Sequence, residues 1–284
     1  MKILITGANG LVGKDLVKYL SKNHKIFALF RNNNKDLYKN KNVKWIKHDL
    51  KNKINLNVKP DYIINCVATH LFSKKRDFVD FYDSHILSIF NIAEFANKKK
   101  IKKIINLSSI TTYGKVKQSK LTEKEIPNNP DVLGMTKFIG EKILKKMFPN
   151  SINLRLPGIL CLNNATDRPL VCRILTSLKD NQKIIAYNKN APFNNIIDTL
   201  EIARILEKIF ISKSFLKGTF NLSANNPIKL CKLIDFMKIN SSSKSKIYYK
   251  LTKNKSFMIS SSKIEKKLGF VPISALTIIK RNLF

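Results

Sequence analysis

A glycine-rich turn near the start of the chain constrains its fold more than any other feature of the sequence. An apolar run from Ile3 to Ile5 leads into glycines at positions 7, 10 and 13, and a helical stretch from Leu11 to Ser21 follows them. A second apolar run, Lys25 to Phe30, comes next. A strand, a glycine turn, a helix and a second strand form a βαβ unit, the building block of parallel sheets. The sequence therefore predicts an α/β fold.

The glycine spacing also predicts a ligand. Glycine lets the backbone turn tightly, approach a pyrophosphate closely and pack the next helix against the sheet. The helix would aim its first amides and the positive end of its dipole at the phosphates. The alternative is a glycine turn without a ligand. We expect a dinucleotide-binding loop, formed by Thr6, Gly7, Asn9, Gly10, Leu11, Val12 and Gly13.

In the rest of the first half of the chain, apolar runs of strand length alternate with stretches that have a helical pattern. Such alternation predicts a doubly wound parallel sheet of the Rossmann type. After Pro157 and Gly158 the pattern becomes irregular, and the polar stretch 240–246 predicts a flexible loop. The expected strands lie near 2–6, 25–30, 43–47, 61–67, 103–107 and 151–156, and the expected helices near 11–22, 84–99 and 131–147.

The glycine pattern is GxxGxxG preceded by Thr6, which resembles the short-chain dehydrogenase/reductase superfamily. The resemblance extends to its branch of nucleotide-sugar epimerases, dehydratases and reductases, and it covers nearly the whole chain. The segments that carry it are His48 to Leu50, Cys66 to Ala68, INLSSITTYG (105–114), LRLPGIL (154–160), FNNIIDTLEIARIL (193–206), GTFNLS (218–223) and KKLGFVP (266–272).

This resemblance implies a division of the chain into two parts. Residues 1–158, with a returning segment at about 193–223, would form the NAD(P)-binding Rossmann domain. Residues 159–192 and 224–284 would form a smaller substrate-binding lobe for a nucleoside-diphosphate sugar. Relatives commonly dimerise through the helices near 84–99 and 131–147. Plausible interface residues are Phe90, Ile139 and Ile143, although burial against the chain's own sheet explains them equally well.

The resemblance also assigns roles to residues. Ser109 aligns with the catalytic serine, which would hydrogen-bond the substrate oxygen, and Lys137 with the lysine that holds the nicotinamide ribose. Asp49 falls where the family places an aspartate near the adenine. The remaining cofactor-binding candidates are Leu50, Cys66, Val67, Ala68 and Pro157.

One departure from the family pattern affects the chemistry. The family's catalytic signature is YxxxK, in which the lysine lowers the phenol pKa, but here Leu133 stands four residues before Lys137. Hydride chemistry on a carbonyl still requires an acid or base. Another group or a held water could move the proton, or the chain could bind its ligands without turnover. A misalignment of this segment is the third possibility.

Three residues are candidate replacements for the tyrosine. His70 follows the strand that ends near Ala68, at the edge where open α/β sheets bind ligands, and imidazole titrates near neutrality. It could equally be a solvated loop residue. Tyr113 lies four residues after Ser109, where packing beneath the substrate is the better interpretation. Lys137 could itself donate if burial depressed its pKa.

The end of the second strand indicates the cofactor. An acidic residue there accepts the ribose 2′-hydroxyl of NAD, whereas arginine favours the 2′-phosphate of NADP. The chain reads ALFRNNN, with Phe30 in the acidic position and Arg31 next, and arginine is scarce among its 53 basic residues. We therefore predict NADP, with NAD possible.

A formal net charge of +34 would fit a polyanion-binding protein. The lysines, however, are spread through every segment with abundant Asn and Ile, as a coding bias would give. We expect weak, salt-sensitive adhesion to polyanions but no specific nucleic-acid partner.

No apolar run approaches the ~18 residues of a membrane span, and no secretory signal is visible, which predicts a cytoplasmic protein without membrane contact. The four cysteines lack metal-ligand spacing, so neither metal nor disulfide is expected.

The sequence thus favours an NADP-dependent oxidoreductase resembling epimerases and 4-keto-sugar reductases. A catalytically silent NADP-binding module and a polyanion binder are the competing functions. The family's dehydratases usually have acidic residues beside the catalytic serine, whereas the neighbours here are Ile110, Thr111 and Thr112, which favours reductase or epimerase over dehydratase.

Overall fold

The computed structural model of the chain describes residues 1–32, 37–69, 77–161, 170–212, 216–252 and 255–283. Contacts between Cα atoms divide these residues into two units, each with its own core. The first unit comprises Met1–Lys115, Ile126–Arg155 and Ile202–Phe220, and the second comprises Val116–Glu125, Leu156–Glu201 and Asn221–Phe284.

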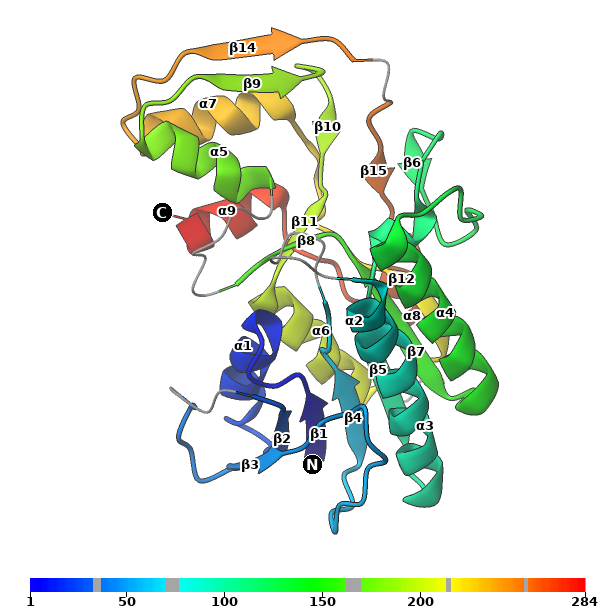
Figure 1. Cartoon of the computed structure of the whole chain (residues 1–284). Helices are drawn as coiled ribbons and strands as arrows, with labels where there is room; N and C mark the ends of the chain where they lie inside the picture. Colours follow the sequence, from blue (N-terminus) through cyan, green and yellow to red (C-terminus); the bar gives the residue numbers. More distant parts are fainter. Residues whose placement is uncertain (33–36, 70–76, 162–169, 213–215, 253–254, 284) are drawn as a thin grey trace. The chain divides into compact units, whose positions relative to one another are not determined.

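A seven-stranded sheet forms the centre of the first unit (Figure 1). Its strand order is β12-β7-β5-β4-β1-β2-β3, and the five strands from β5 to β3 pair in parallel. This order, with the chain winding both ways from β1, confirms the predicted doubly wound Rossmann sheet. The strands are β1 (Lys2–Thr6), β2 (Lys25–Phe30), β3 (Val43–Lys47), β4 (Tyr62–Asn65), β5 (Lys103–Ser109), β7 (Ser151–Leu156) and β12 (Gly218–Asn221).

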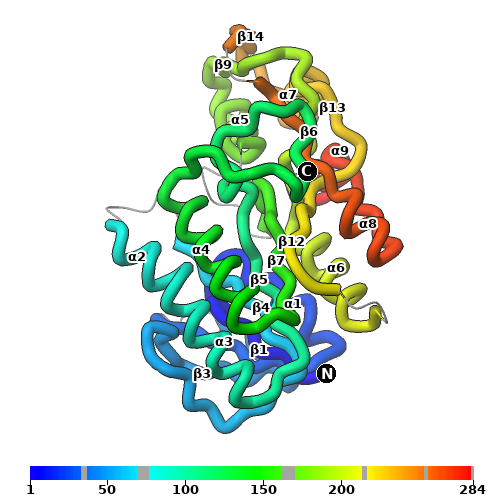
Figure 2. Tube along the Cα trace, turned by 90° about the vertical axis from the view of Figure 1, so that its right-hand side faces the viewer, coloured from blue at the N-terminus to red at the C-terminus, as the bar shows by residue number. Residues whose placement is uncertain are grey.

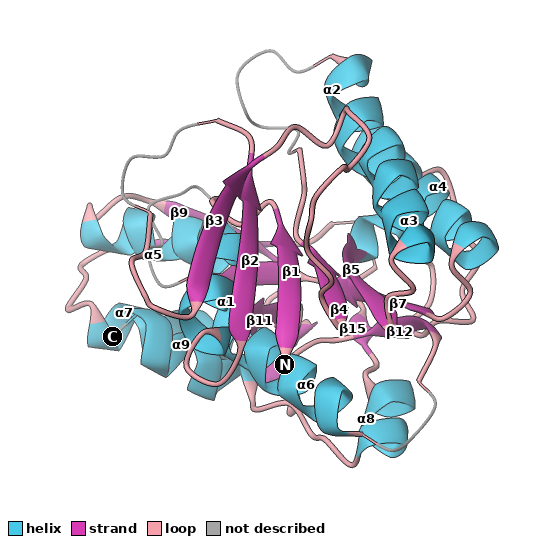
Figure 3. Cartoon of the chain, turned by 90° about the horizontal axis from the view of Figure 1, so that it is seen from below, coloured by secondary structure: helices cyan, strands magenta, loops and turns pink. Residues whose placement is uncertain are grey.

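Helices cover both faces of this sheet (Figure 3). On one face, Leu4, Ile63 and Ile104 pack against α3 (Ser88–Lys98) and α4 (Val132–Met147). The other face is covered by α1 (Leu11–Leu20) and α6 (Thr199–Ile211). Because both faces are buried, β1 and β2 read as nearly continuous apolar runs rather than alternating ones.

The helix expected near 84–99 is longer than predicted and contains a wider turn. It begins with α2 (Phe78–Tyr82), which is capped by Asp77 through a 3.3 Å hydrogen bond from the Asp80 amide. A π-helical turn, η1 (Asp83–Leu87), then joins α2 to α3. A π turn shifts the set of residues that face the core relative to a regular α-helix. A search of the sequence for a 3.6-residue period therefore does not detect it.

Helix α4 packs closely against its neighbours, and Figure 2 shows α3 and α4 side by side. A Cβ at Gly134 would lie 2.1 Å from the Thr111 carbonyl oxygen, in the short 3₁₀ helix η2 (Ile110–Tyr113). A Cβ at Gly140 would lie 2.4 Å from the carbonyl oxygen of His85 in η1. Asp131 caps the helix by accepting a 2.8 Å hydrogen bond from the Gly134 amide. The two glycines therefore let α4 approach η1 and η2, the second of which directly follows β5.

The second unit has a core of its own, built around α5 (Leu170–Lys179), α7 (Leu230–Asn240) and α9 (Ala275–Leu283). The prediction of a flexible loop at 240–246 was wrong in part, because Ser243 is buried and its hydroxyl donates a 2.5 Å hydrogen bond to the Leu178 carbonyl. The other elements are α8 (Ser262–Leu268) and the short strands β6 (Lys120–Leu121), β8 (Gly158–Leu160), β9 (Ile184–Tyr187), β10 (Pro192–Phe193), β11 (Ile196–Asp198), β13 (Ile228–Lys229), β14 (Ile247–Lys250) and β15 (Met258–Ile259).

The helices of the described residues are short relative to the thickness of a bilayer. A membrane-spanning helix needs about 20 apolar residues, whereas α4 has 16 and carries several charges. Among the described residues, no helix is both long and apolar enough to cross a membrane.

Candidate functional site

The turn between β1 and α1 presents backbone amides at the carboxyl end of the sheet. Gly7 has a φ of +64°, in the left-handed region that glycine adopts readily. A Cβ at Gly13 would lie 2.2 Å from the Gly7 carbonyl oxygen, so only glycine allows this packing. Gly10 is the N-cap of α1 and has no side chain to occupy the amides of Leu11 and Val12. The turn therefore fits an anionic group such as a pyrophosphate.

The end of β2 lies beside this turn. The Asn9 side-chain amide donates a 2.6 Å hydrogen bond to the Asn32 carbonyl, next to Arg31. Arg31 is exposed, and Phe30 before it packs edge-on against Trp45 of β3. The structure thus brings two of the predicted cofactor residues, Asn9 and Arg31, to one edge of the sheet.

The segment after β3 is anchored at the same edge. The His48 amide donates a 2.9 Å hydrogen bond to the Phe30 carbonyl. Asp49 accepts a hydrogen bond from the Lys51 amide at 3.1 Å. Leu50 is buried, and its carbonyl accepts a 2.7 Å hydrogen bond from the Asn91 side chain. Asp49 and Leu50 therefore follow directly on the end of the strand that pairs with β2.

The end of β4 packs directly against the glycine turn. The Cys66 amide donates a 3.1 Å hydrogen bond to the Thr6 carbonyl. A Cβ at Gly7 would lie 3.0 Å from the Cys66 carbonyl carbon and from the Val67 amide nitrogen. Burial raises the pKa of the Cys66 thiol to about 12, with Lys137 acting in the opposite direction. The thiol is therefore protonated at neutral pH and is not a nucleophile. Ala68, the next predicted residue, is exposed.

Lys137 is a buried ammonium on α4. Its Nζ donates a 3.0 Å hydrogen bond to the carbonyl oxygen of Leu107 in β5. Burial lowers the pKa of Lys137 to about 8, although Glu141 and Cys66 oppose that shift. A lysine with a pKa this close to neutrality can both carry a charge and exchange a proton under physiological conditions.

Ser109 ends β5, two residues after the carbonyl that Lys137 contacts. Its Oγ accepts hydrogen bonds from the Thr111 amide at 3.1 Å and the Thr111 hydroxyl at 2.9 Å. With its lone pairs occupied, the Ser109 hydroxyl can donate its own hydrogen to a ligand oxygen. Ser109 is half-buried. The structure thus brings Ser109 and Lys137 to the end of the same strand.

The candidate replacements for the tyrosine differ in their surroundings. Leu133 begins the face of α4 that carries Lys137 and is half-buried. Tyr113 is fully buried, and the guanidinium of Arg155 lies 4.4 Å from its ring centre. His70 lies outside the described residues. Pro157, predicted to contact the cofactor, is buried and belongs to the second unit.

A line of polar side chains crosses the sheet and was not predicted. The Thr6 hydroxyl donates to the Asn65 oxygen at 2.7 Å. The Asn65 amide then donates to Asn106 at 2.9 Å, and the Asn106 amide donates to Asn153 at 2.9 Å. We call Thr6, Asn65, Asn106 and Asn153 the asparagine ladder. It joins β1, β4, β5 and β7 through buried side chains.

A buried ion pair lies on α4 one turn after Lys137, and it too was not predicted. Arg155 of β7 binds the Glu141 carboxylate through two nitrogens, the shortest contact being 2.6 Å from Nη2 to Oε2. The Ser108 hydroxyl donates to the same carboxylate at 2.5 Å. Glu141 and Arg155 are 4% and 6% exposed, which makes their charges strongly dependent on each other.

His85 forms a third buried polar feature that the sequence interpretation missed. It accepts a 3.0 Å hydrogen bond at Nε2 from the Thr69 amide, and its Nδ1 lies 2.9 Å from the Thr136 hydroxyl. These contacts link η1, the end of β4 and α4. The available signal for all three features was the same, namely polar residues at positions where a buried element requires apolar ones.

The fold and these residues define a dinucleotide-binding α/β protein. The model of the NAD dependent epimerase/dehydratase family matches residues 3–189. The chain belongs to that family, which confirms the resemblance found in its motifs. No curated protein sequence is similar enough to this chain to count as a match.

Solved structures of other proteins share the fold. The Bordetella bronchiseptica enzyme WbmG in complex with NAD and UDP has a TM-score of 0.83 at 18% identity, covering 99% of this chain and 93% of that one. UDP-glucuronic acid 4-epimerase from Bacillus cereus in complex with NAD gives 0.80 at 19%, covering 98% and 95%. The UDP-Glc/GlcNAc 4-epimerase from Campylobacter jejuni gives 0.81 at 18%, covering 100% and 98%.

The buried ion pair generates a stability prediction. Replacing Arg155 with Met leaves the Glu141 carboxylate buried without its cation, which we expect to lower the free energy of unfolding by about 3–5 kcal/mol. The double variant Arg155→Met/Glu141→Gln removes the buried charge and keeps an acceptor for Ser108, so it should regain at least half of that loss. Urea denaturation followed by circular dichroism measures both. A loss below about 1 kcal/mol in the single variant, the level of an exposed pair, would contradict the prediction.

Proposed function

We propose that the chain is an NAD(P)-dependent oxidoreductase that transfers hydride at a sugar carbon of a nucleoside-diphosphate sugar. The observation that carries the proposal is the meeting of Ser109 and Lys137 at the end of β5, in the unit that also holds the glycine turn. The structural neighbours support the ligand class, because WbmG was crystallised with NAD and UDP, and the Bacillus cereus enzyme is a UDP-glucuronic acid 4-epimerase.

The residues of this chain would divide the work as follows. The amides at the start of α1 bind the pyrophosphate, and Asp49 and Leu50 flank the adenine. Lys137 binds the nicotinamide ribose, and Ser109 donates a hydrogen bond to the sugar oxygen. The cofactor, when bound, supplies or accepts the hydride. We propose further that the second unit is the substrate lobe, and that the protein is cytoplasmic.

In the family, the tyrosine donates the proton, but this chain has Leu133 in that position. We propose that the Lys137 ammonium supplies it, directly or through a water shared with Ser109. Its lowered pKa supports this role. Tyr113 is a poorer candidate because its ring is buried beneath the Arg155 guanidinium.

A silent binding module is the second candidate function, and Leu133 is the observation that favours it. Both candidates bind cofactor, so affinity does not distinguish them. Turnover at a fixed protein concentration does.

We predict that the purified protein oxidises NADPH with at least one nucleoside-diphosphate 4-keto sugar. The rate should fall as the pH rises through about 8, because only the protonated Lys137 has a proton to give. Lys137→Ala should lower the rate by about 10²–10⁴-fold, the usual contribution of a general acid. Absorbance at the NADPH band over a pH series measures both effects.

Leu133→Tyr serves as the control, because it restores the family's donor. If the wild type is silent while Leu133→Tyr turns over, the natural chain is a binding module. If the wild type turns over with a rate that does not change near pH 8, the proton does not come from Lys137.

The neighbours were crystallised with NAD, but Phe30 and Arg31 favour NADP in this chain. We predict that Arg31→Ala weakens NADP binding about tenfold, the value of one charged hydrogen bond, and leaves NAD within about twofold. Isothermal titration calorimetry with each cofactor gives the ratio of the variant's dissociation constant to that of the wild type. Lys44→Ala, which removes an exposed charge from β3, is the matched control. Equal losses for NAD and NADP would argue against a 2′-phosphate contact.

We also propose a homodimer through α3 and α4. Phe90 and Ile139 are 41% and 37% exposed on these neighbouring helices, whereas Ile143 packs against the chain's own core. The double variant Phe90→Glu/Ile139→Glu should therefore be monomeric in sedimentation velocity. Ile211→Glu/Ile239→Glu, at positions that are 70% and 75% exposed on other helices, should leave the assembly unchanged. A monomeric wild type would rule the interface out.

A further inference from the structure

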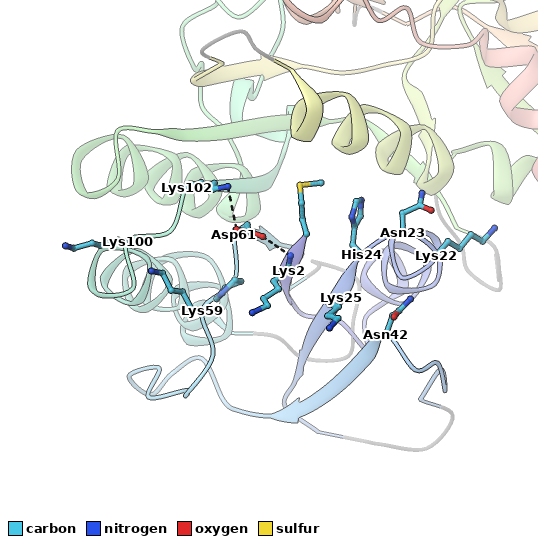
Figure 4. A pocket seen from close by; sticks show the side chains of 12 residues that line it. Lys2, Lys22, Asn23, His24, Lys25, Asn42, Lys59, Asp61, Lys100 and Lys102 are labelled. Atoms are coloured by element: carbon cyan, nitrogen blue, oxygen red, sulfur yellow. Dashed lines mark hydrogen bonds and ion pairs between the residues drawn. The ribbon is translucent and has the colours of Figure 1, made fainter.

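A lysine-lined groove lies in the first unit at the amino ends of its strands, away from the glycine turn (Figure 4). The glycine turn follows the last residue of β1, whereas the groove begins at the first. Its walls come from the amino ends of β1 and β2 and from the segments that lead into β2, β3, β4 and β5. The cavity measures about 800 Å³. The proposed reaction makes no use of this edge of the sheet.

The charge of the lining is strongly one-sided. Among the described residues, Asp61 is the only carboxylate that lines the groove. It accepts a 2.9 Å hydrogen bond from the Lys2 amide and lies 3.6 Å from the Lys102 Nζ. The cations are Lys2, Lys22, Lys25, Lys59, Lys100 and Lys102.

A buried histidine of the lining contacts a neighbouring helix. His24 is 7% exposed, and its Nε2 lies 2.9 Å from the Glu207 carboxylate of α6. Among the described residues, its Nδ1 has no hydrogen-bond partner. Because the ring is buried and contacts Glu207, it joins this wall of the groove to α6.

The chemistry of the lining limits the class of ligand that the groove can bind. No Phe, Tyr or Trp among the described residues lines the groove, so it offers no platform on which a base could stack. Its apolar members are Met1 and Pro60, too few to receive a lipid chain. Lysine ammonium groups bind phosphates as point charges without demanding one geometry.

From these observations we infer that the groove binds a linear oligophosphate, a small anion with several phosphoryl groups, at a site separate from the cofactor. The inference does not depend on the proposed oxidoreductase activity. Its main rival is the general attraction of a protein of charge +34 for any polyanion. The test must therefore compare variants of equal charge.

The groove variant is Lys22→Gln/Lys25→Gln/Lys59→Gln. The control, Lys145→Gln/Lys146→Gln/Lys266→Gln, removes the same three charges from exposed positions outside the lining. Both leave the core untouched, and circular dichroism verifies their folding. Binding of inorganic tripolyphosphate is measured by calorimetry near 0.15 M salt, where the screening length is about 8 Å.

We expect the groove variant to bind tripolyphosphate about 10- to 100-fold more weakly and the control to remain within about twofold of the wild type. Equal losses in both variants would show general charge attraction and overturn the site, as would no binding by the wild type. A single-stranded RNA of equal charge is the last arm. If it binds more tightly than tripolyphosphate and loses affinity only in the groove variant, the site is a nucleic-acid site and the oligophosphate assignment is wrong.

Discussion

The position of the candidate catalytic residues depends on the buried carboxylate of Glu141. It lies on α4, and its partners Arg155 and Ser108 come from β7 and β5, so one group joins the helix to two strands. A carboxylate left alone at this depth would cost several kcal/mol. Any sliding of α4 along the sheet is therefore strongly disfavoured. Lys137 lies one helical turn before Glu141 and Ser109 directly follows Ser108, so both inherit their placement from this contact.

The asparagine ladder fixes the register of the strands that carry the candidate site in a similar way. Asn65 and Asn106 are register partners in β4 and β5, and Thr6 is the register partner of Asn65 in β1. A slip of one residue would turn each amide to the opposite face and leave it buried without a partner. The ladder thus makes the register of these strands nearly unique. Since the Val67 amide also donates to the Asn65 oxygen at 3.3 Å, the segment that faces the glycine turn is fixed with them.

The fold could be predicted because the features that determine it are short segments that can be recognised one at a time along the sequence. Apolar runs of strand length, the glycine turn and helical stretches follow one another along the chain, and the parallel sheet follows from that alternation. The π turn at Asp83–Leu87 could not be predicted, because it is stabilised by contacts of His85 with Thr69 and Thr136, residues distant in sequence. The pairing of Glu141 with Arg155 was hidden for the same reason. The positions of Ser109 and Lys137 came from motif spacing, whereas the lowered pKa of Lys137 depends on burial that only the packed helix provides.

Leu133 affects the proton chemistry in two ways that act together. A phenol one turn before Lys137 would donate the proton and would also help to solvate the ammonium. An aliphatic side chain does neither, so the charged form of Lys137 retains chiefly the Leu107 carbonyl and the more distant field of Glu141. A less well solvated ammonium releases its proton more readily, and proton transfer is most efficient when the pKa of the donor lies near the working pH. In the proposed mechanism, the substitution that removes the family's acid would therefore move the neighbouring lysine toward the same task.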